Sequence, residues 1–336
     1  MAVHWFRVVR AWSTASDLLA LQVRPEHEAA MSPMNNRDAS QAHLNTPLRS
    51  ALALAGSPAV SLTKQMTVPR AFFALADPVV EQVTARAREL ESQGDAETLH
   101  KLRVALRRLR ALWWAFTPLM DRAQAKLHRD EFKRLAGAAG GTRDWDVLSG
   151  LLSSDDKVRA IVKSVAPAIT AQRLLALSCS RATLKHRDIE PFMRGALLGT
   201  LHQFEEHADE PITNFVETRV RKAEKALRSR IKHAHSRKRP DYDALHEVRI
   251  AGKKLRYLLE FFAPVLKGRH EKIIKRLTTF QTKLGDLNDV VVSEVKLRET
   301  PLAGVDENDL QQALNWMVVQ KKRHLRSAQR HLARIT

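Results

Sequence analysis

One segment of this sequence occurs twice, and the repetition limits the possible folds more than any other property. Residues 99–110 read LHKLRVALRRLR, and residues 245–256 read LHEVRIAGKKLR, with equivalent residues at the same internal spacing. A second pair follows in the same order, because GGTRDWDV at 140–147 is matched by GDLNDVVV at 285–292. Two matched pairs in one order indicate an internal duplication. We therefore expect two related structural units along the chain.

The residues around both segments predict α-helices. Leu99, Leu102, Leu106 and Leu109 follow the helical spacing of an apolar face that packs on partner helices. Asp, Gly and Pro stand where they would begin or end helices, and no stretch shows the alternation typical of a strand. The expected helices cover about 77–92, 95–116, 122–139, a shorter one from 144, a long one from 155, 211–236, 241–263, 268–285 and 306–333. The expected class is all-α, with about five helices per unit and antiparallel neighbours across short connections.

The character of the chain changes near residue 76. Residues 1–76 contain scattered Pro, Ser, Asn and Thr without a sustained helical period, so we expect a flexible or poorly ordered N-terminal segment. Residues 77–336 form the expected helical domain, with a first repeat at about 77–207 and a second at about 211–336. The single Cys179 excludes an internal disulfide framework, and no apolar run is long enough to span a bilayer. These features predict a cytoplasmic protein.

The charge of the chain favours an anionic partner. With 56 Lys and Arg against 37 Asp and Glu, the formal net charge is +19. Such a balance promotes association with phosphate polymers or anionic membranes and says nothing about the fold.

Each copy of the repeated segment places a row of cations on one helical face. The rows comprise His100, Arg103, Arg107 and Arg110 in the first copy, and His246, Arg249, Lys253 and Arg256 in the second. Like charges three or four residues apart on a helix cost a few tenths of a kcal/mol per pair. Each row is about 15 Å long, which suits a chain of phosphates better than one small metabolite. An ordinary solvated basic face is the alternative.

The two His-x-x-Arg-x-x-x-[Arg/Lys]-[Arg/Lys]-Leu-Arg segments, with Gly-x-x-Arg-Asp and Gly-x-x-Asn-Asp downstream, resemble the CHAD family, the conserved histidine α-helical domain. The resemblance covers roughly residues 77–334. It implies two tandem four-helix bundles related by pseudo-twofold symmetry, with basic helices lining a groove or pore between them. It also implies binding of inorganic polyphosphate along that groove, and an association with polyphosphate granules.

The resemblance further implies a set of anion-binding residues. The two motifs supply His100, Arg103, Arg107, Arg108, Arg110, His246, Arg249, Lys253, Lys254 and Arg256. Arg143 matches the downstream motif, whereas the second copy has Asn288 at that position. Asp144 and Asp289 are expected as helix caps. Further candidates from neighbouring helices are Lys133, Arg134, Arg221, Arg228, Lys275 and Lys283.

The sequence shows no motif for catalysis, a metal or a cofactor. His100 and His246 are not part of a His-Glu-x-x-His arrangement, and neither a phosphate-binding glycine loop nor a nucleophile elbow is present. The Glu-x-Glu-x-Lys strand of the CYTH-type triphosphatase domain, which some relatives carry, is also missing. We therefore expect a polyphosphate-binding protein that is not an enzyme and that binds nucleic acid at most weakly. Two alternatives stay open, a nucleic-acid-binding helical protein and an enzyme that processes polyphosphate or triphosphate.

Overall fold

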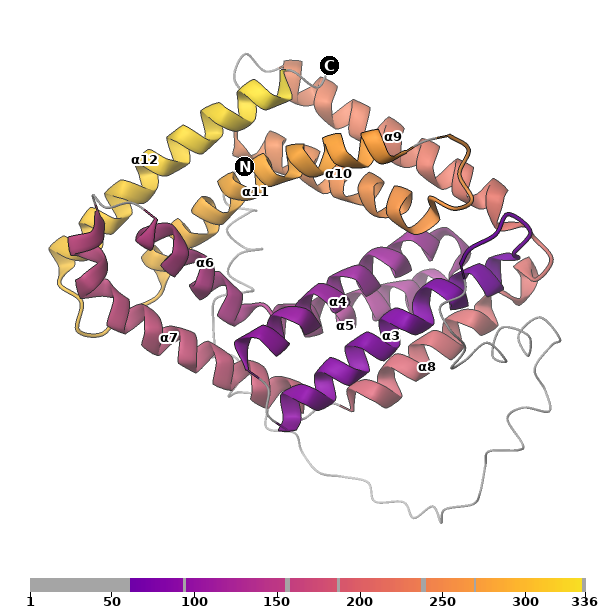
Figure 1. Cartoon of the computed structure of the whole chain (residues 1–336), viewed down its shortest axis with the longest axis horizontal. Helices are drawn as coiled ribbons and strands as arrows, with labels where there is room; N and C mark the ends of the chain where they lie inside the picture. The colour runs from indigo at the N-terminus through magenta and orange to yellow at the C-terminus, as the bar shows by residue number, and fades with distance from the viewer. Residues whose placement is uncertain are drawn as a thin grey trace, which may run out of the picture. The chain divides into compact units, whose positions relative to one another are not determined.

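The computed structural model describes residues 61–92, 95–154, 158–185, 188–236, 240–268 and 270–333. Within these ranges the chain is α-helical (Figure 1), apart from short 3-10 turns and one isolated β-bridge between Thr67 and Pro211. The expected all-α class is confirmed. The α-helices are α3 (Val68–Ser92), α4 (Ala96–Phe116), α5 (Arg122–Ala138), α6 (Gly141–Ser153), α7 (Arg159–Lys185), α8 (Ile189–Gln203), α9 (Ile212–Ser236), α10 (Tyr242–Phe262), α11 (Glu271–Glu299) and α12 (Glu307–Leu332).

The first described helix begins earlier than the sequence suggested. Helix α3 starts at Val68 rather than near Asp77, and it continues through Pro78. Phe72 and Phe73 are buried, so residues 68–76 belong to the folded domain, and the boundary expected at residue 76 is wrong for this stretch. Burial of two aromatic side chains outweighs the backbone hydrogen bond that a proline removes from a helix. Residues 1–60 lie outside the described part of the chain.

The second copy of the downstream motif lies inside a helix, not at a helix start. Helix α11 runs through Gly285, where an added Cβ would meet no atom within 4 Å. In the first copy the chain turns at Gly140, where an added Cβ would lie 3.1 Å from the Gly137 carbonyl oxygen. Asp289 is therefore in mid-helix and Asp144 is in the first turn of α6, so neither is the expected N-cap. One long helix replaces the α5–α6 pair of the first copy.

An aromatic core joins α3, α4 and α5. The Phe72 ring meets the Trp113 and Phe116 rings edge to face, with centroid separations of 5.0 and 5.1 Å. Phe132 of α5 lies 5.2 Å from Trp113 in the same manner. The Trp113 indole N–H donates to the Thr200 hydroxyl of α8 at 3.1 Å. Edge-to-face aromatic pairs stabilise a core beyond the area that they bury, and here they pack the C-terminal part of α4 against its neighbours.

A second core draws on both halves of the chain. Trp145 of α6, Val165 of α7, Val290 of α11 and Met317 of α12 are all buried in it. Helix α6 packs on α11, and α7 packs on α12. The two expected repeats therefore share a core instead of forming two self-contained bundles.

The packing of the helices is similar in the two halves. Helix α3 packs on α4 as α9 packs on α10, and α6 packs on α7 as α11 packs on α12. Helices α4 and α10 also contact each other (Figure 1). This parallel agrees with the expected duplication, which stays a prediction. No helix in the described ranges is both long enough and apolar enough to cross a membrane.

Candidate anion-binding site

The two helices that carry the repeated motif begin in the same way. The Asp95 carboxylate accepts a hydrogen bond from the Thr98 backbone N–H at 2.8 Å, and the Asp241 carboxylate accepts one from Ala244 at 2.9 Å. Such N-caps satisfy backbone donors that a helix leaves open at its first turn. They fix the first residue of α4 and of α10, and thereby the rotation of each cationic row about its helix axis.

The structure brings the two cationic rows together where α4 passes α10. Arg107 of α4 donates from Nη2 to the Tyr257 hydroxyl of α10 at 3.4 Å. Burial is the main cause that lowers the pKa values of Arg249 and Lys253, and repulsion by Arg107 adds to it, so these three cations lie within electrostatic reach of one another. Arg110 and His246 adjoin the same group. We call Arg107, Arg110, His246, Arg249 and Lys253 the cationic cluster.

The α10 side of the cationic cluster is partly buried and carries more positive than negative charge. Burial is the main cause that lowers the pKa of Lys253 to about 7, and repulsion by Arg249 and Arg107 adds to it. Burial also lowers the pKa of Arg249, although attraction by Asp289 opposes the change. The Arg249 Nε is buried and has no hydrogen-bond partner among the described residues. Unpaired buried charge is costly, so these groups would gain free energy from an anion.

A polar network borders the cationic cluster at α10 and α11. The Tyr242 hydroxyl donates to the Asn288 amide oxygen at 3.1 Å and lies 3.3 Å from His246 Nδ1. Burial raises the pKa of Tyr242 to about 12, so this phenol stays neutral at physiological pH. Burial also raises the pKa of Asp289, against the attraction of Arg249 and Arg143. Asn288 thus has a structural role in orienting Tyr242, and Asp289 is a carboxylate close to the cations.

Arg103 lies between α4 and α6 instead of in the cationic cluster. Its Nη1 donates to the Gly140 carbonyl oxygen at 3.0 Å and lies 3.6 Å from the Asp144 carboxylate. The side chain therefore closes the tight turn that precedes α6. We infer that Arg103 mainly stabilises the fold next to the site.

Changing Arg103 to Ala is therefore expected to lower the free energy of unfolding by about 1–2 kcal/mol, because a charge-assisted hydrogen bond to a partly buried carbonyl is lost. Urea denaturation followed by circular dichroism would measure this change. The matched control is Lys101→Ala on the same helix, where the exposed ion pair with Glu97 at 3.7 Å contributes little. Equal stability of the two variants would contradict the structural role of Arg103.

Three other motif residues contact aromatic rings. The Arg108 guanidinium lies 5.5 Å from the centroid of Phe261, and the Lys254 ammonium lies 5.1 Å from that of Trp114. Arg256 donates to the Gln281 amide oxygen at 2.9 Å and to the Glu260 carboxylate at 2.5 Å. Cation–π contacts hold a charge without neutralising it, whereas the carboxylate partner of Arg256 reduces its attraction for an anion.

The remaining candidates from neighbouring helices lie outside the cationic cluster. Lys133 of α5, Arg221 of α9 and Lys275 of α11 have exposed side chains. Three others have a carboxylate neighbour on their own helix, in the pairs Arg134–Glu131 at 2.6 Å, Arg228–Glu224 at 4.0 Å and Lys283–Asp286 at 3.8 Å. None of these positions shows the dehydrated, unpaired charge that distinguishes Arg249 and Lys253.

Tyr257 is a site residue that the sequence analysis missed. Its hydroxyl accepts from Arg107, and the Arg256 guanidinium lies 5.0 Å from its ring centroid. The chain has two Tyr, and both Tyr242 and Tyr257 lie on the helical stripe of α10 that carries His246, Arg249 and Lys253. The sequence alone could therefore have identified Tyr257 as a site residue, because its hydroxyl stands at helical spacing from these cations. The corresponding positions of the first copy, Ala96 and Ala111, have no hydroxyl.

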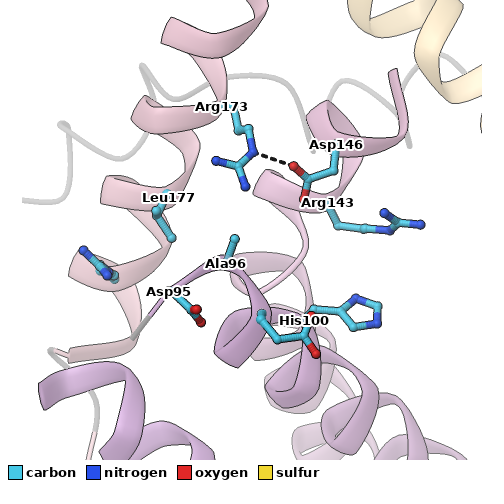
Figure 2. Close-up of a pocket in the computed structure, with 9 residues that line it drawn as sticks. Asp95, Ala96, His100, Arg143, Asp146, Arg173 and Leu177 are labelled. Carbon is cyan, nitrogen blue, oxygen red and sulfur yellow. Dashed lines mark hydrogen bonds and ion pairs between the residues drawn. The ribbon is translucent and has the colours of Figure 1, made fainter. Parts of the chain in front are cut away.

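A cavity of about 720 Å³ lies at the start of α4, against α6 and α7. His100 and Arg143, both expected in the site, line it together with Arg173 of α7 (Figure 2). Arg181 of α7 also lines it. In the described ranges, no three His, Cys, Asp or Glu side chains gather into a group that could hold a metal ion.

Comparisons with known proteins agree with this fold. The structure matches a crystal structure titled the CHAD domain from the plant Ricinus communis, with a TM-score of 0.66 and 24% identity over 82% of this chain and 95% of that one. It also matches PptA from Streptomyces chartreusis, with a TM-score of 0.53 and 15% identity over 80% of this chain and 99% of that one. At these identities the matches establish a shared fold. No curated protein matches this chain in sequence.

The sequence itself identifies the family. The model of the CHAD domain matches residues 74–298, which include both repeated motifs and most of the helices described above. The chain belongs to the CHAD domain family.

Proposed function

We propose that this chain binds inorganic polyphosphate through the cationic cluster, as a binding module that catalyses no reaction. The observation that carries this proposal is the partly buried positive charge of Arg249 and Lys253 opposite Arg107, with the Arg249 Nε buried and without a hydrogen-bond partner among the described residues. The resemblance of both motifs to the CHAD family supports the same ligand. We further propose that this binding occurs in the cytoplasm and recruits the protein to polyphosphate granules.

The arrangement of the cationic cluster favours a polymer over a single small anion. Its members come from two helices, and on α4 the row extends beyond Arg107 to His100, past Arg103, which is bound to the Gly140 carbonyl. Arg presents forked donors that suit phosphate oxygens, and Lys acts as a point charge. A phosphate chain can supply charge along the whole row and releases its counterions on binding.

Two observations weigh against the alternatives. Proteins that bind single-stranded nucleic acid usually stack bases on exposed aromatic rings. In this chain Trp113 and Trp145 are buried, and Arg219 and Lys254 both lie over the ring of Trp114. A hydrolase acting on phosphate anhydrides usually needs clustered carboxylates for metal ions, and the described residues contain no such group.

Calorimetric titration with long-chain polyphosphate at two salt concentrations tests the proposal. Contacts with about three to four phosphates imply a roughly tenfold loss of affinity when the salt concentration is raised threefold. An oligonucleotide of equal charge is expected to compete only at much higher concentration. Tighter binding of the oligonucleotide would favour the nucleic-acid alternative, and metal-dependent release of phosphate by the purified protein would favour the enzyme alternative.

A further inference from the structure

The cavity beside α7 presents a basic face that the repeated motifs do not include. Arg173, Leu177 and Arg181 are four residues apart in sequence, so they follow one stripe of α7, and all three line the cavity. The opposite wall includes His100 of α4 and Arg143 of α6. Figure 2 shows Arg173 reaching across to Asp146 of α6.

Three carboxylates, Asp95, Glu97 and Asp146, also line this cavity, and each has a hydrogen-bond or ion-pair partner. Asp95 caps α4 through the Thr98 backbone N–H. Glu97 lies 3.7 Å from Lys101, and Asp146 accepts from Arg173 Nε at 2.5 Å.

The cations at the cavity, in contrast, keep capacity for a ligand. Arg181 is exposed and has no carboxylate within ion-pairing distance among the described residues. The Arg173 side chain uses its Nε for Asp146, which leaves the outer guanidinium nitrogens available for a further acceptor. The cavity therefore combines free guanidinium donors with enough space for phosphate groups.

The cavity lies at one end of the cationic row on α4, and the cationic cluster lies further along the same helix. His100 is the first residue of this row and lines the cavity, and Arg107 belongs to the cationic cluster. Arg103 lies between them in sequence and is bound to the Gly140 carbonyl, 3.6 Å from Asp144. Arg143 lines the cavity and also lies within electrostatic reach of Asp289, the carboxylate next to Arg249. An extended anion bound at the cationic cluster can therefore follow α4 toward the cavity, where further cations are available.

We infer that this cavity is a second phosphate subsite, in which Arg173 and Arg181 of α7 bind the part of a polyphosphate chain that extends beyond the cationic cluster. The inference rests on the proposed function. It adds α7, which the repeated motif does not include, to the helices that bind polyphosphate. A polyphosphate that is long enough to bind at the cationic cluster and in the cavity at the same time gains affinity from the linked contacts. A polyphosphate too short to reach the cavity does not. The subsite thus favours long chains over short ones.

The test compares Arg181→Ala and Arg181→Glu with the matched controls Lys163→Ala and Lys163→Glu. Lys163 is an exposed cation in the first part of α7, far along the helix from Arg181, and does not line the cavity. Arg181→Ala is expected to weaken binding of long-chain polyphosphate roughly two- to fivefold and to lower the salt slope by about one, as for one exposed phosphate contact. Arg181→Glu is expected to weaken binding more than Arg181→Ala, and adding Arg173→Ala deepens the loss. Binding of tripolyphosphate is expected to change much less.

Failure of the inference and failure of the proposed function give different results. If the unmodified protein does not bind long-chain polyphosphate, the proposed function is wrong. If it binds, but Arg181→Glu binds long chains as tightly as Lys163→Glu, the subsite is rejected while the cationic cluster stands. Equal weakening for tripolyphosphate and for long chains would also reject it, because the cavity would then not be an extension of the site. Thermal melting of each variant checks that the fold is kept.

Discussion

Changing Arg107 and Arg249 to Ala together is expected to weaken polyphosphate binding by about a hundredfold or more. Each guanidinium can make charge-assisted hydrogen bonds to phosphate, and each such bond contributes about 1.5–3 kcal/mol when it is shielded from water. Two lost contacts of this size correspond to a change in Kd of at least about a hundredfold. Isothermal titration calorimetry at one fixed salt concentration would measure the loss.

The control for this variant removes the same charge elsewhere. Arg70 of α3 and Lys185 of α7 are exposed and lie outside both the cationic cluster and the cavity. The double variant Arg70→Ala/Lys185→Ala is expected to change the affinity less than about threefold, because exposed charges act mainly through the screened field of the whole protein. Equal losses in the two double variants would mean that net charge, and not the cationic cluster, attracts the polymer.

Changing Lys253 to Met is expected to raise the stability of the protein while it weakens binding about tenfold or more. A protonated Lys253 is unfavourable in the fold, since burial and neighbouring cations lower its pKa from 10.5 to about 7. Replacing a buried ion pair by apolar side chains of similar size is often neutral or stabilises a protein by about 1–4 kcal/mol, and removing the partly buried charge of Lys253 is expected to act in the same direction. Urea denaturation at pH 6.5, together with calorimetric titration, would show the two opposite effects. A variant that loses stability and affinity together would instead indicate a structural lysine.

The same group makes stability and binding depend on pH. In the unfolded chain Lys253 keeps its proton up to about pH 10.5, whereas in the fold it loses it near pH 7. The unfolded state therefore binds more protons between these values, and the contribution of Lys253 to stability rises with pH across this window. A bound polyanion favours the charged form, so binding above pH 7 is expected to take up a proton. Titrations in buffers of different ionisation enthalpy would detect this uptake, and Lys253→Met would abolish it.

The helical class and the cationic faces of the motif helices were predictable from local pattern. The apolar period fixes which side of a helix is buried, and Asp95 and Asp241 cap α4 and α10 through contacts within three residues of themselves. The start of α3 at Val68 was not predictable from Pro78, because tertiary burial of Phe72 overrides the local cost of proline. Local pattern likewise suggested a stop at Gly285 that packing in α11 overrides.

Which cations share a site depends on partners that are distant in sequence. The row on α4 looked uniform, yet Arg103 binds the Gly140 carbonyl, while Arg107 meets Tyr257 of α10. Lys254, next to the partly buried Lys253, lies over Trp114. Helical spacing gives the direction of a side chain about its own axis, but it does not give the helix that lies opposite.

The core shared by Trp145, Val165, Val290 and Met317 has a consequence for how such a chain could have arisen. Because α6 and α7 cover apolar residues of α11 and α12, a polypeptide with one half alone would leave half of this surface open to water. Two identical short chains could have covered each other's open surface by pairing as a homodimer. Fusion of their genes would then have joined the partners in one polypeptide. The two motif helices were then free to diverge, so that α4 carries exposed cations and α10 carries a partly dehydrated stripe flanked by two tyrosines.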